Sequence, residues 1–166
     1  MRREKQPDNT IYSKLPNLRN SYLCNYAVVG NSTEFGTGKH LIRYKFVKYF
    51  NLQSSQVKRA NYRIYSLNRH RETLETKTIL EDWCSLTGNW NEGYEYGPQV
   101  AKTSSAKHEF VFDITDELKK WCDDLTGQKE HNGLVLSTEF EQEGVYSVIL
   151  SNDNTLYSNV TEVILK

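Results

Sequence analysis

The side chains best suited to ligand binding are three aromatic rings in one glycine-rich segment. Trp90, Tyr94 and Tyr96 occur in GNWNEGYEYG, among small polar residues that cannot cover them. A flat ring can stack on the apolar face of a sugar while nearby Asn and Glu side chains bond its hydroxyls. We therefore expect these three residues to be candidate carbohydrate-binding residues. In the alternative, Trp90 folds onto the core and both tyrosines pack on a sheet.

The titratable residues show no catalytic spacing. None of the four histidines lies in an HExxH or HxH pattern (His40, His70, His108 and His131). No nucleophile elbow or dinucleotide fingerprint occurs, and GTGK at 36–39 lacks the following Ser or Thr of a phosphate loop. We therefore expect no enzyme and no catalytic residue.

Two kinds of charged cluster have alternative interpretations. The pairs Glu81-Asp82 and Asp123-Asp124 could supply calcium ligands, but such charges more often flank strands and helix ends. We expect no cofactor and no metal site, and a structural Ca²⁺ is not indicated. The basic run that begins with Lys58, Arg59 and Arg63 could meet an acidic polysaccharide or keep an edge strand soluble.

Composition favours one all-β domain. The chain has 166 residues, with 21 Lys plus Arg against 21 Asp plus Glu, so it lacks the net charge of a nucleic-acid binder. No apolar run approaches the roughly 20 residues of a membrane span, so we expect no membrane insertion. Eleven tyrosines and six phenylalanines favour strands over helices.

In the stretch HEFVFDITDELKKWCDDLTG, the spacing of the apolar residues changes in the middle. Residues 108–114 alternate apolar and polar side chains, as in a half-buried strand. Apolar residues then recur at helical spacing, which predicts one short helix at about residues 115–125. Thr115 can cap this helix and Gly127 can end it, while Asp113 accepts backbone N–H bonds from the turn.

Short alternating segments elsewhere predict an antiparallel β-sandwich of the jelly-roll kind. The remaining strands are expected at Thr10–Leu15, Ser21–Val29, Leu41–Phe50, Val57–Leu67, Leu74–Trp83, Gly133–Thr138, Val145–Ser151 and Val160–Leu165. Residues 85–106 look like a long loop. Residues 1–9 form a polar N-terminal arm without the features of a signal peptide, and residues 10–166 form a single domain.

The three cysteines, Cys24, Cys84 and Cys122, lack metal-ligand spacing. An odd number cannot pair fully within one chain. The alternatives are buried free thiols, one bridge with one free thiol, or bridges between chains.

Several segments resemble the DNRLRE-type domain, which overlaps carbohydrate-binding module family 96 and the disaggregatase-related repeats. They are SYLCNYAVVGNSTEFG, LIRYKFVKYFNLQSSQVKRANYRIYSL, EDWCSLTGNW, FDITDELKKW and NGLVLSTEFEQEGVYSVILSNDN. They occur in the family's order and span roughly residues 10–166. The family's closing segment appears only as VTEVILK, and GYEYGPQVA replaces its usual Asn-x-Pro segment.

The resemblance implies a non-catalytic jelly-roll module of a bacterial surface or secreted protein. Some relatives bind acidic polysaccharides and others serve as stalks. It also implies structural roles for Trp83, Trp90, Asp113, Thr115 and Trp121, with Trp83 and Trp121 closing one end of the sandwich. Cys84 and Cys122 follow those two tryptophans, so the resemblance makes them neighbours and a candidate disulfide.

Two functions follow as hypotheses, both at a cell or spore surface or outside the cell. In the first, the module binds polysaccharide or acts as a stalk or adhesion domain. In the second, copies of the chain assemble into an extracellular fibre or appendage. There the strand containing Ile11 and Tyr12 would add to a neighbour's sheet, and Cys24 could lock the contact.

Overall fold

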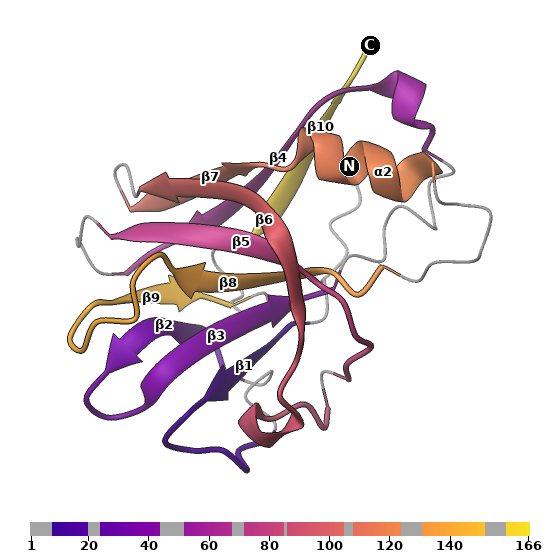
Figure 1. The fold of residues 1–166 in the computed structure, drawn as a ribbon. Coiled ribbons are helices and arrows are strands. Elements are labelled where there is room, and N and C mark those ends of the chain that lie inside the picture. The colour runs from indigo at the N-terminus through magenta and orange to yellow at the C-terminus, as the bar shows by residue number, and fades with distance from the viewer. Residues whose placement is uncertain are drawn as a thin grey trace.

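The computed structural model shows two antiparallel β-sheets packed as a sandwich, with one α-helix (Figure 1). It describes residues 8–19, 24–43, 52–67, 72–84, 86–104, 108–123, 131–151 and 159–166. Ten strands lie within these residues, seven in one sheet and three in the other. The predicted all-β sandwich is confirmed, and α2 (Thr115–Asp123) is the one α-helix among the described residues.

The larger sheet has the strand order β6-β5-β8-β3-β2-β9, and β1 pairs with β3 beside this path. Its strands are β1 (Asp8–Tyr12), β2 (Tyr26–Ser32), β3 (Gly36–Ile42), β5 (Thr73–Ile79), β6 (Tyr96–Ser104), β8 (Leu134–Thr138) and β9 (Tyr146–Leu150). In β8, Leu134 and Leu136 face one side and Val135 faces the other, and all three are buried. The larger sheet is therefore covered on both faces.

The smaller sheet has the order β10-β4-β7, formed by β4 (Val57–Tyr65), β7 (Glu109–Asp113) and β10 (Val160–Leu165). The short 3₁₀ turn η2 (Ser54–Gln56) leads into β4. At the other end of β4, the next residue, Ser66, forms an antiparallel bridge with Ile149 of β9, which joins the two sheets along one side.

The main core fills the space between the sheets. Phe112 of β7 stacks with Tyr62 of β4 and with Phe110, and all three side chains are almost completely buried. The helix α2 (Thr115–Asp123) adds Leu118, Trp121 and Cys122 to this core. These two elements confirm the switch from strand to helix that the alternating and helical periods predict.

A second, smaller core covers the outer face of the larger sheet. Ile11, Leu41, Ile79 and Val135 point outward from four strands, and the segment after β5 folds back over them. This segment contains the 3₁₀ turn η3 (Trp90–Glu92) and contributes Trp83 and Tyr94, with Trp90 and Tyr96 packed at its margin. Residues 86–104 are thus not a long loop, because they contain η3 and the nine-residue strand β6.

The N-terminal boundary differs from the expectation. Strand β1 starts at Asp8, so residues 8 and 9 belong to the domain and not to an arm. Its five residues pair with β3 of the same chain, and Ile11 and Tyr12 are buried. A strand held in this way is not free to add to a neighbour's sheet, so Ile11 and Tyr12 are not assembly residues in this structure.

All three cysteines are free thiols in the structure. Cys122 lies on the buried face of α2, whereas Cys84 and Cys24 are exposed. The expected Cys84–Cys122 bridge is absent because the preceding tryptophans do not close one end together. Trp121 belongs to the core between the sheets, and Trp83 belongs to the core on the outer face.

Candidate functional site

The aromatic segment proves to be mainly structural. Tyr94 is only 8% exposed, and its hydroxyl donates a hydrogen bond to the Glu92 carboxylate. Burial is the main cause that raises the pKa of Tyr94. A ring in this position cannot stack on a sugar, so the ligand role expected for Tyr94 is wrong. The physical reason is that the apolar outer face of the sheet has to be covered.

Trp90 and Tyr96 are half-buried at the margin of this second core. The Nζ atom of Lys39 lies 5.4 Å from the Trp90 ring centroid and 5.0 Å from that of Tyr96. The same Nζ pairs with Glu141 at 3.6 Å. A lysine of the chain itself therefore occupies the position over both rings, which leaves them poorly placed to stack on a ligand.

A buried group of polar residues resembles a catalytic set but cannot act as one. His40 Nδ1 lies 2.9 Å from the Thr10 hydroxyl, and His40 Nε2 lies 3.4 Å from an Asp8 carboxylate oxygen. All three residues are at most 3% exposed. No substrate can reach these atoms, so the group serves to hold β1 against β3.

The expected structural residues Asp113 and Thr115 link β7, α2 and β4. The Thr115 backbone N–H donates to Asp113 Oδ1 at 3.0 Å, as predicted, and the Thr115 hydroxyl donates to the same oxygen at 2.5 Å. The hydroxyl also accepts from the Ala60 N–H at 2.9 Å. The first helical bond runs from Leu118 to Ile114, so Thr115 anchors the helix to β4 and is not its cap residue.

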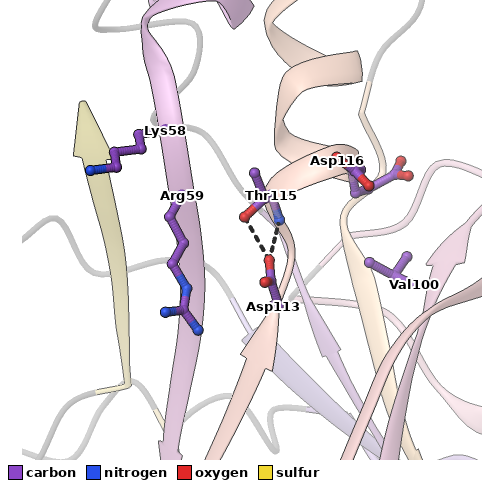
Figure 2. A pocket seen from close by; sticks show the side chains of 7 residues that line it. Lys58, Arg59, Val100, Asp113, Thr115 and Asp116 are labelled. Atoms are coloured by element: carbon purple, nitrogen blue, oxygen red, sulfur yellow. Dashed lines mark hydrogen bonds between the residues drawn. The ribbon is translucent and has the colours of Figure 1, made fainter. Parts of the chain in front are cut away.

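The most promising cavity lies beside this junction and has a volume of about 460 Å³. We call it the mixed-charge pocket, and Figure 2 shows the side chains that line it. Its lining consists of Lys58 and Arg59 of β4, Val100 of β6, Asp113 at the end of β7, and Thr115, Asp116 and Glu117 at the start of α2. Its size falls within the range typical of small-ligand sites.

The pocket contains both cationic and anionic side chains. Among the described residues, neither Lys58 nor Arg59 forms an ion pair, and both are exposed. The pKa of Asp113 is lowered, first by its hydrogen bonds to Thr115 and also by the positive charges of Arg59 and Lys119. Asp113 is therefore a carboxylate at neutral pH. The pocket offers both acidic acceptors and unpaired basic donors to a ligand.

The sequence predicted a ligand role for the basic side of this pocket but not for its acidic side. The basic run suggested contact with an acidic polysaccharide, but the alternative that it protects an edge strand is wrong, because β4 is the middle strand of its sheet. Arg63, farther along β4, pairs with Glu109 and Glu162 of the two neighbouring strands and is structural. Val100 and Asp116 gave no signal in the sequence, since distant segments bring them to the pocket.

Within the described ranges, no group of three or more metal-ligating side chains occurs, and no helix is long and apolar enough to cross a membrane.

No family model matches the chain, and no curated protein matches it. The resemblance to DNRLRE-type domains therefore stays a prediction that rests on the segments quoted above.

Proposed function

We propose that this chain is a non-catalytic module that binds an acidic carbohydrate in the mixed-charge pocket. The observation that carries the proposal is that Lys58 and Arg59 line a concave site together with Asp113 and Asp116. Within the part of the chain that the structure describes, neither cation has an ionic partner. A ligand that carries an anionic group would supply that partner.

The other side of the pocket suits the rest of a sugar. Sugar hydroxyls are donors, and the exposed carboxylate of Asp116 can accept from them. A uronic acid combines both kinds of group, because it carries one carboxylate among several hydroxyls. The pocket is open and its charges are solvated, so we expect weak binding per sugar, with a Kd on the order of 0.1–1 mM.

The resemblance stated above supports the same function, since related domains are expected to be surface modules that bind polysaccharide or act as stalks. We accordingly propose a location at the cell or spore surface or outside the cell. In this role the chain needs no cofactor, and the sandwich serves as a rigid frame for the pocket.

The decisive test of this function removes the two cations. In affinity electrophoresis with polygalacturonate, the variant Lys58→Ala/Arg59→Ala should bind at least about tenfold more weakly than the wild type. The matched control Lys14→Ala/Lys102→Ala removes the same charge outside the pocket and should stay within about twofold. The proposal fails if polygalacturonate retards the pocket variant as strongly as the control, or if it does not retard the migration of the wild type.

The alternative proposal is self-assembly into an extracellular fibre, and one observation favours it. Strand β10 lies at the end of the smaller sheet, pairs with β4, and exposes Ile164 and Leu165 by 42% and 53%. Among the described strands, none pairs with the other side of β10. Such an edge with exposed apolar residues can pair with a second copy, and it would then form the contact.

Assembly predicts particles larger than a monomer at micromolar concentration. If copies join through β10, sedimentation should show oligomers that Val163→Pro dissociates, because proline removes a backbone N–H from the strand. Far-UV circular dichroism checks that this variant remains folded. A wild-type chain that sediments as a monomer with and without reductant would exclude the alternative.

A further inference from the structure

A second cavity of about 560 Å³ lies next to the mixed-charge pocket. We call it the helix pocket. Its wall includes Thr78 at the end of β5, Asp82 after it, Lys120 and Trp121 of α2, and His131 and Asn132 before β8. These residues combine a cation, a carboxylate, a hydroxyl and aromatic rings, which are groups that bind sugars.

The two cavities share a wall. Glu117 lines both of them. The helix residues of the mixed-charge pocket are Thr115, Asp116 and Glu117, and those of the helix pocket are Glu117, Lys120 and Trp121. Residues 117, 120 and 121 are spaced i, i+3, i+4 and therefore lie on one face of α2. The pockets are thus successive compartments along that face.

We propose that the two pockets form one groove along α2 that binds an internal stretch of an acidic polysaccharide chain. This inference rests on the proposed function and adds that the ligand is a polymer whose internal units occupy both pockets. From Thr115 to Trp121 the helix advances about 9 Å, at 1.5 Å per residue. A groove that follows the helix over this length, through both pockets, accommodates successive units of a polymer better than a single terminal sugar.

The charges along the groove alternate. Lys58 and Arg59 stand at one end, the carboxylates of Asp116 and Glu117 follow, and Lys120 comes next. The Nζ atom of Lys120 lies 3.1 Å from Glu117, but its side chain is 70% exposed, so a ligand can reach it. Acidic groups that recur along a polymer would meet the two cationic regions, and hydroxyls between them would donate to the carboxylates.

The floor of the helix pocket is held in place. The His131 ring packs against Trp121 with 5.4 Å between centroids, and His131 Nε2 lies 3.2 Å from the Trp121 carbonyl oxygen. The indole N–H of Trp83 donates to the Asn132 carbonyl at 2.6 Å. These contacts fix residues 131 and 132, so the second compartment exists before any ligand binds.

The test compares ligand lengths by isothermal titration calorimetry. For the wild type, hexagalacturonate should bind at least about tenfold more tightly than digalacturonate. Lys120→Ala should remove most of this gain, and the readout is the ratio of the two affinities within each variant, because Lys120 also pairs with Glu117, which lines the mixed-charge pocket. Lys102→Ala serves as the control, because it removes an exposed lysine outside both pockets, and it should keep the gain in affinity with ligand length.

Each contrary result has its own meaning. Equal affinities for the two lengths, or a length effect that Lys120→Ala leaves intact, would overturn the groove while the proposed function stands. Absence of binding to either oligosaccharide would overturn both. Oligoglutamate bound as tightly as hexagalacturonate would show an anionic peptide site and would refute the polysaccharide class.

Discussion

Replacing Gly133 with alanine should destabilise the protein by about 4 kcal/mol, enough to unfold much of a marginally stable domain. Gly133 has φ +89°, which L-residues with a Cβ rarely adopt, and an added Cβ would lie 1.9 Å from the Ile42 carbonyl oxygen. The residue also accepts the Ile79 N–H at 3.1 Å, immediately before β8. The change would therefore push β8 away from both neighbouring strands, and urea denaturation measures the loss.

Gly93 provides the control, because it also has a positive φ but lacks the crowding. It has φ +64° and nothing lies within 4 Å of an added Cβ. Gly93→Ala should cost only about 1 kcal/mol, the penalty of the left-handed conformation itself. Equal losses at Gly93 and Gly133 would mean that the close approach of Ile42 does not limit this position.

The sequence predicts those parts of the fold that local patterns determine. Strand β7 and helix α2 follow from one period-2 segment and one apolar stripe, and β4 follows from Ala60, Tyr62 and Ile64 on one side. In each case the side chains that alternate in the sequence are those that enter the main core. Such elements can be predicted from their own sequence, because burial of one face produces a periodic pattern of apolar residues.

Strand β6 has no such pattern and could not be predicted from the sequence. Its residues YGPQVAKTS are exposed or half-buried along the whole strand, and its pairing with β5 is interrupted by two register shifts. Its position is determined by β5, not by its own side chains. Strand β3 is also hard to predict, because GTGK contains two glycines, a composition typical of turns. In the structure, the close approach of the Val28 carbonyl oxygen requires the absence of a side chain at Gly38.

The candidate site depended on long-range geometry in the same way. The rings of Trp90, Tyr94 and Tyr96 look uncovered in the sequence because their cover is the outer face of a sheet built by distant strands. Conversely, Arg59 and Asp116 are 57 positions apart and carry no shared pattern. Only the crossing of β4, β7 and α2 places them in one pocket.

Trp83→Ala should destabilise the protein by about 3–5 kcal/mol. The side chain is 3% exposed, belongs to the second core, and is held by its indole N–H bond to Asn132 at 2.6 Å. Removing it would leave a cavity over the outer face of the sheet and an acceptor without its donor. The measurement is the free energy of unfolding from chemical denaturation, followed by tryptophan fluorescence of the two remaining indoles.

Two further variants separate the contributions of Trp83. Trp83→Phe keeps an aromatic ring but loses the N–H, so it should cost about 1–2 kcal/mol. Trp90→Ala removes a half-buried indole at the margin of the same core and should cost less than Trp83→Ala, because less apolar surface leaves the interior. If Trp90→Ala proved the more damaging of the two, the second core would be centred on η3 and not on Trp83. The order of these losses therefore tests whether the outer face of the larger sheet is a true second core, on which the floor of the helix pocket depends.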